Sequence, residues 1–99
     1  MLRVALGSDE VEVRFDHKFC APDEIEGLTG ICVDENRRCS LATVNLNGKM
    51  VGRGLAVCHP GDNFCRATGR KKAMAYAVHP LSKEFRAAVW REYEVQMGF

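Results

Sequence analysis

The sequence has no apolar run that approaches the roughly 20 residues of a transmembrane helix. Its first residues, MLRVALGSDEVEV, hold only a short apolar stretch before Asp9 and Glu10, so they do not resemble a signal peptide. It also has no internal repeat, no low-complexity tract and no linker rich in glycine, serine or proline. We therefore expect one soluble domain over residues 1–99, located in the cytoplasm.

Common signatures of metal and nucleotide sites are missing too, since there is no Cys-x-x-Cys pair and no phosphate-cradling glycine loop. The five cysteines are an odd number, which argues against a framework made only of disulfides and favours reduced, buried thiols. Cys65, with His59 as a base, lacks a recognisable oxyanion site, so we expect no enzyme and no cofactor. A zinc-stabilised module stays open as an alternative, with these ligands: Cys39, Cys58, His59 and Cys65.

Charge is present in both signs but is unevenly distributed. Residues 1–36 carry three basic and nine acidic side chains, whereas residues 37–99 carry eleven basic and four acidic ones, for a net charge of +1. Such asymmetry indicates a charged partner, or two halves that neutralise each other in the fold.

The N-terminal third predicts a hairpin and then a loop. Residues 2–6 and 11–15 read as two short strands, because apolar and polar residues alternate in the second of them. Residues 16–27 read as a loop with a helical turn after Pro22. Residues 28–33 read as a short strand, and a polar loop follows over residues 34–38.

The clearest predicted element is a second hairpin made by residues 40–47 and 49–58. Asn47 and Gly48 form the strongest short hairpin signal, because both tolerate the positive φ of a type I′ turn. Gly52 and Gly54 in the returning strand predict a bulge or the close approach of another backbone.

Two helices are expected after this hairpin. Asp62 is a good N-cap for the first, which should end near Val78, and Ser82 caps a second that stops near Gly98. The stripe of Gly69, Ala73 and Ala77 should let the first helix lie close to a sheet or to another helix. The sequence thus predicts an α+β fold, with a small antiparallel sheet of four to five strands followed by two C-terminal helices.

The first of these helices carries a cluster of positive charge near its start, where the helix dipole disfavours cations. Arginine offers planar bidentate donors to phosphate and carboxylate groups, and lysine offers a point charge. The expected binding residues of this basic helix and hairpin are Arg66, Arg70, Lys71, Lys72, Arg53, Lys49, Arg37 and Arg38.

The stretch NGKMVGRGLAVC with GRKKAMAYAV resembles the C-terminal half of a double-stranded RNA-binding domain. Lys71 and Lys72 match the first two lysines of that family's Lys-Lys-x-Ala-Lys pattern, while Met74-Ala75 occupies the place of the third. The resemblance implies phosphate contacts with duplex RNA from these lysines.

A longer pattern, C-x-P-x-D-x-F-x-R-x-x-G-R-x-x-A, is similar to one in small phage-encoded proteins of mostly unassigned function. It is formed by Cys58, Pro60, Asp62, Phe64, Arg66, Gly69, Arg70 and Ala73. This resemblance implies a mobile-element protein that acts in the cytoplasm of a host cell, on nucleic acid or on a host defence complex such as a CRISPR effector.

Two hypotheses follow for the function. In the first, the chain is a non-enzymatic inhibitor that docks on a host complex that handles nucleic acid, through its basic face or its acidic N-terminal half. In the second, it binds duplex RNA or DNA directly. The net charge of +1 is low for a dedicated nucleic-acid binder and favours the first hypothesis.

Overall fold

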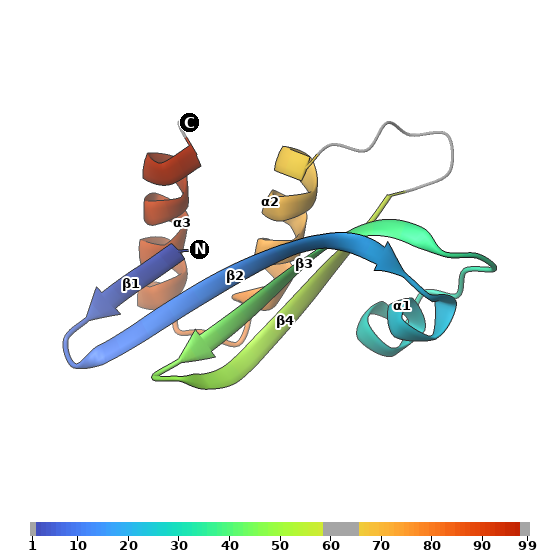
Figure 1. The fold of residues 1–99 in the computed structure, drawn as a ribbon. Coiled ribbons are helices and arrows are strands. Elements are labelled where there is room, and N and C mark those ends of the chain that lie inside the picture. Colours follow the sequence, from blue (N-terminus) through green and yellow to red (C-terminus); the bar gives the residue numbers. More distant parts are fainter. Residues whose placement is uncertain (1, 59–65, 98–99) are drawn as a thin grey trace.

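The computed structural model describes residues 2–58 and 66–97, without the side chains of Arg66 and Met97. Its strands form one antiparallel sheet in the order β1-β2-β3-β4, and two helices follow the sheet (Figure 1). This arrangement confirms the predicted α+β fold. The elements are β1 (Leu2–Leu6), β2 (Asp9–Cys20), α1 (Pro22–Thr29), β3 (Arg37–Leu46), β4 (Lys49–Val57), α2 (Arg66–Ala77) and α3 (Lys83–Met97).

Both predicted hairpins are present, and each turns at a residue of positive φ. Gly7 connects β1 to β2 with a φ of 62°. Asn47 and Gly48 connect β3 to β4 with φ values of 52° and 83°, as a type I′ turn requires. The Asn47 side chain also reaches across to β2, where its Oδ1 accepts a hydrogen bond from the Glu10 N–H (2.9 Å) and its Nδ2 donates one to Asp9 (3.0 Å).

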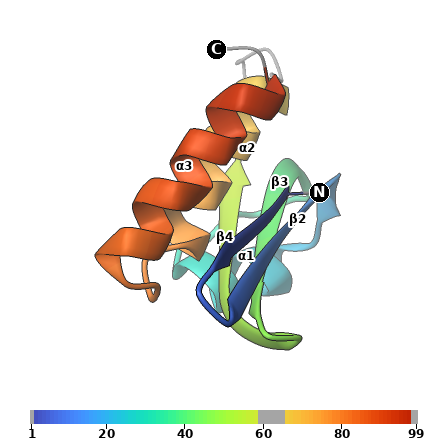
Figure 2. The ribbon, with the colours of Figure 1, turned by 90° about the vertical axis from the view of Figure 1, so that its left-hand side faces the viewer.

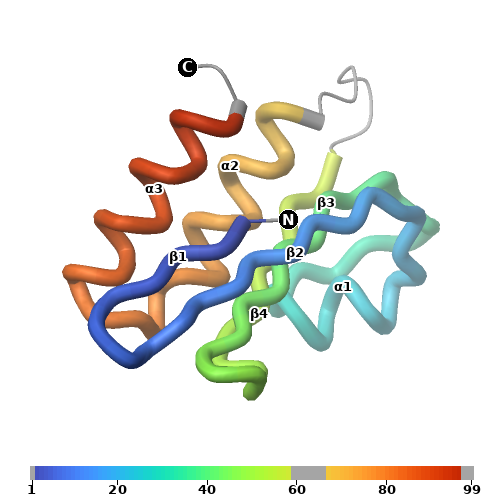
Figure 3. The backbone as a smooth tube through the Cα atoms, turned by 60° about the vertical axis from the view of Figure 1, so that its left-hand side comes forward, coloured from blue at the N-terminus to red at the C-terminus, as the bar shows by residue number. Residues whose placement is uncertain are grey.

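The sheet buries apolar side chains on both of its faces. Helices α2 and α3 cover one face of the sheet (Figure 2). The cluster on this face includes Val13, Val44 and Met74, together with the buried Tyr93. The opposite face carries a smaller cluster in which α1 places Ile25 against Leu41 and Leu55. Figure 3 shows α1 on the other side of the strands from α2 and α3.

Helix α2 lies unusually close to β4 because two glycines of the strand leave room for it. A Cβ atom on Gly52 would overlap the carbonyl oxygen of Ala77, and one on Gly54 would overlap that of Ala73. The close approach predicted from these glycines is thus confirmed, and the pairing register also shifts between Val44 and Asn45, as a bulge requires.

The stretch between the hairpins differs from the prediction. Strand β2 continues to Cys20, because residues 16–20 pair with the first part of β3 although their sequence is largely polar. The predicted strand over 28–33 was wrong. Its first two residues end α1, and Gly30 then stops the helix in the left-handed region with a φ of 75°.

The C-terminal helix follows the prediction. The Ser82 Oγ accepts a hydrogen bond from the Phe85 N–H (3.3 Å), as an N-cap does. The predicted N-cap of α2, Asp62, lies outside the described residues. Within the described ranges, no helix is both long enough and apolar enough to cross a membrane.

Candidate binding surface

A cleft of about 330 Å³ runs along the outer edge of β4. Its floor is the strand segment from Arg53 to Val57. One wall is the end of α1 with the loop that follows, and the other is the exposed side of α2. The volume is at the lower end of the range that ligand sites occupy.

The α1 wall is held in place by its last residue. The Thr29 hydroxyl donates a hydrogen bond to the Ile25 carbonyl oxygen (2.7 Å) and accepts one from the Ile31 N–H (3.1 Å). Since Ile25 is fully buried under the sheet, these bonds tie the loop to the core. Ile31 is thereby positioned at the cleft with half of its surface exposed.

Two of the predicted basic residues meet at this cleft from different elements. Arg53 lies on β4 opposite Thr43, and Lys72 lies on α2; both are exposed. No residue that lines the cleft is acidic. Neither cation has an ion pair with any described acidic residue, so the cleft presents uncompensated positive charge.

Apolar side chains surround these cations. Tyr76 is 64% exposed, Ile31 is 50% exposed and Leu28 is 38% exposed, and all three line the cleft. A monomer gains nothing by leaving large apolar groups in water at one place, and such groups beside a cleft are typical of a binding surface.

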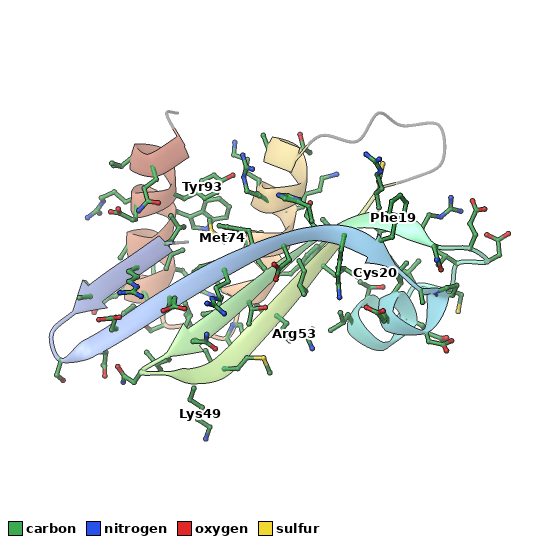
Figure 4. All side chains as sticks on the ribbon, viewed as in Figure 1. Phe19, Cys20, Lys49, Arg53, Met74 and Tyr93 are labelled. Atoms are coloured by element: carbon green, nitrogen blue, oxygen red, sulfur yellow. The ribbon has the colours of Figure 1, made fainter. Side chains whose placement is uncertain are left out.

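The other predicted cations of the basic helix and hairpin whose side chains are described do not line the cleft. Lys71 is exposed beside Lys72. Lys49 stands at the tip of the second hairpin and points away from the sheet, further down the strand than Arg53 (Figure 4). Arg70 is half-buried, and its Nε has no hydrogen-bond partner in the described part of the chain. The Arg66 side chain lies outside the described residues.

Arg37 and Arg38 are at the start of β3, just beyond the Val57 end of the cleft, and do not line it. Arg37 is bound by its own loop, through ion pairs with Glu35 (2.8 Å) and Asp34 (3.6 Å), and its side chain is only 15% exposed. Arg38 lies over the ring of Phe19 on the neighbouring strand, 5.3 Å from its centroid. Among the predicted residues whose side chains are described, Arg53 and Lys72 line the cleft and Arg37 and Arg38 do not.

The two described cysteines of the predicted zinc set lie on opposite faces of the sheet. Cys39 pairs with Val57 and belongs to the cluster under α1, whereas Cys58, one residue further on, faces the other way. The other two residues of that set, His59 and Cys65, lie outside the described residues, so the zinc alternative stays a prediction. Residues 2–58 and 66–97 contain no group of three potential metal ligands. Burial, with a hydrogen bond to Cys20, raises the pKa of the Cys39 thiol to about 12.

A histidine and a serine also meet inside the fold. The His17 Nδ1 lies 2.8 Å from the Ser40 Oγ. Ser40 is 1% exposed and lies directly beneath Gly69 of α2, where a Cβ atom would overlap the hydroxyl. No substrate could reach that oxygen, so we assign the pair to packing.

The apolar side chains that line the cleft were not predicted from the sequence. Leu28 and Ile31 were placed in a predicted strand, and their exposure depends on where α1 ends. Tyr76 carried no distinguishing signal either, since it lies three residues after Ala73, beside the stripe that faces the sheet, and its exposure depends on β4 being the edge strand.

The chain matches no protein-family model, no curated protein and no solved structure.

Proposed function

We propose that this chain is a non-enzymatic binding protein that docks on a host protein complex through the cleft at the edge of β4. The observation that carries the proposal is the meeting of Arg53 and Lys72 with three exposed apolar side chains and no acidic one. Protein interfaces combine a desolvated apolar centre with a charged rim, which this arrangement supplies.

The chemistry of the cleft favours a protein over a nucleic acid. Nucleic-acid binding takes most of its affinity from many phosphate contacts along a basic track. Here two cations stand among Leu28, Ile31 and Tyr76, and two of the other predicted arginines are already engaged, one by carboxylates of its own loop and one by the Phe19 ring. A protein surface with acidic and apolar groups fits this pattern better than a row of phosphates.

The acidic N-terminal half is the weaker docking surface, because several of its carboxylates already have partners. Glu12 pairs with Arg3 and Arg14, and Lys18 donates a hydrogen bond to Glu24 (3.2 Å), which raises the pKa of that lysine. Mimicry of nucleic acid would need these carboxylates to be available to the partner.

The phage-type pattern suggests what the partner does. Its described part includes Gly69, Arg70 and Ala73, of which Gly69 and Ala73 pack α2 on the sheet. The pattern therefore supports the fold that presents the cleft, and its resemblance to phage-encoded proteins leads us to propose a host complex that handles nucleic acid, such as a CRISPR effector.

The test is capture of the partner from a host lysate, with and without nuclease treatment. We expect a protein partner that is retained after nuclease treatment. Loss of the captured material on nuclease treatment would contradict the proposal and would indicate that nucleic acid is bound directly.

One observation favours direct nucleic-acid binding as the second candidate. Phe19 is 62% exposed and carries Arg38 over its ring. Aromatic rings beside arginines stack bases of single strands, so this observation favours a single strand over the duplex that the sequence resemblance implies. If this candidate is correct, labelled oligonucleotides should bind with an affinity that falls steeply with salt, and Phe19→Ala should weaken that binding.

A further inference from the structure

The hydrogen bonds between β4 and β3 show which backbone N–H and C=O groups of β4 point away from the sheet. In an antiparallel pair, hydrogen-bonded residues alternate with residues whose backbone groups point the other way. The Cys58 N–H donates to the Arg38 carbonyl oxygen (2.9 Å), so the even-numbered residues near this end of β4 bond to β3. The N–H and C=O groups of Arg53, Leu55 and Val57 therefore point away from β3.

These outward groups lie in the cleft. Strand β4 is the last in the sheet order, and residues 53–57 form the floor between the two walls. Five residues of strand extend over about 17 Å. An edge of this length that no strand of the sheet pairs with is a template for one more strand, because its donors and acceptors are already arranged for pairing. The edge is open at Arg53, whereas Leu55 at its centre is only 3% exposed, so an added strand must move the walls apart there.

The walls would hold such a strand on both sides. The side chains of the added strand would alternate between the two faces of the sheet. On the α1 side they would meet Arg53 and Ile31, and on the α2 side they would meet Lys72 and Tyr76. Each wall thus offers one cation and apolar surface.

We propose that the edge of β4 binds an extended acidic segment of the partner protein as a fifth strand, with carboxylates at Arg53 and Lys72 and apolar side chains against the walls. Charge complementarity identifies the occupant, since the cleft holds two cations and no acid. A second copy of this chain fits poorly, because pairing two β4 edges would bring together two sets of these cations. The inference rests on the proposed function, for which it specifies the mode of docking.

The test uses two capped seven-residue peptides in which pairs of glutamates alternate with pairs of valines, one beginning with each pair, so that both faces of the added strand carry glutamate and valine. Backbone amide exchange of the full chain is followed by NMR as each peptide is added. We expect slower exchange at Arg53, Leu55 and Val57, while Gly54 and Ala56, already paired with β3, change little. A peptide with lysine in place of glutamate should not bind.

Charge variants supply the matched control. The double variant Arg53→Ser/Lys72→Ser should weaken peptide binding about fivefold, as the loss of two exposed ion pairs predicts. The variant Lys83→Ser/Arg91→Ser removes the same charge from exposed positions on α3 and should bind as the wild type does.

Two results would overturn the inference. One is that neither glutamate peptide binds at millimolar concentration, and the other is binding that leaves the exchange at residues 53, 55 and 57 unchanged. If a nuclease-resistant partner is nevertheless captured through Arg53 and Lys72, the proposed function stands and only strand addition is rejected. If the peptides bind and no protein is captured, the proposed function fails instead.

Discussion

Replacing Gly54 with alanine would place a Cβ atom against the backbone of α2. This atom would overlap the Ala73 carbonyl oxygen and would lie 2.7 Å from the Ala77 nitrogen and 2.8 Å from the Tyr76 Cβ. None of these atoms is the end of a flexible side chain, so the whole helix must move away from the sheet. That movement would loosen the core at Ala73 and would also carry Lys72 and Tyr76 away from Arg53.

Two opposing effects determine how much Gly54→Ala changes the free energy of unfolding. Overpacking a well-packed core costs about 1–3 kcal/mol, and the backbone contacts at Gly54 place this substitution at the upper end. Removing a glycine from a strand returns roughly 0.5–1 kcal/mol, because alanine loses less backbone entropy on folding. We therefore expect Gly54→Ala to lower the free energy of unfolding by about 2 kcal/mol, or the Tm by roughly 8–16 °C.

Urea denaturation followed by circular dichroism measures this change. Gly27→Ala is the matched control, since a Cβ atom there meets nothing within 4 Å and Gly27 lies inside α1. It should raise the free energy of unfolding by about 0.5–1 kcal/mol. If Gly54→Ala is as stable as the wild type, α2 does not approach β4 as described, and the geometry of the cleft is wrong.

Three further predictions concern other parts of the fold. Asn47→Ala should lower the free energy of unfolding by about 2 kcal/mol, because alanine is strained at a φ of 52° and the hydrogen bonds to β2 are lost. Urea denaturation measures this change, and a midpoint urea concentration equal to that of the wild type would contradict the role of this turn. The stability of the protein should fall as the pH rises from 9.0 toward 12, because the unfolded chain releases the Cys39 proton at lower pH than the folded chain, and Cys39→Ala should reduce that fall. Iodoacetamide at neutral pH should label the exposed Cys32 long before the buried Cys20 and Cys39, which mass spectrometry of the peptides can check.

Local sequence signals predicted the elements whose causes are local. Strict alternation marked the first hairpin, Asn47-Gly48 marked the second, and Ser82 marked the start of α3. The small residues Gly69, Ala73 and Ala77 also predicted which side of α2 packs closely, and the structure shows that this side meets the sheet. In each case, the residues that decide the structure lie within a few positions of the feature.

Elements fixed by distant contacts were not predicted. The polar residues 16–20 become a strand only because β3 pairs with them, and no alternation in their own sequence indicates this. At the site, Arg53 and Lys72 were both predicted, but their meeting with Ile31 was not. It depends on α1 crossing the opposite face of the sheet, which follows from the burial of Ile25.

Capture from a nuclease-treated host lysate with two charge variants tests directly whether the cleft at β4 is the docking surface. Arg53→Ser/Lys72→Ser and Lys83→Ser/Arg91→Ser lower the net charge equally, and both should fold as the wild type does. We expect the first variant to lose most of the captured partner and the second to retain it. Equal capture by both variants would show that the protein docks elsewhere.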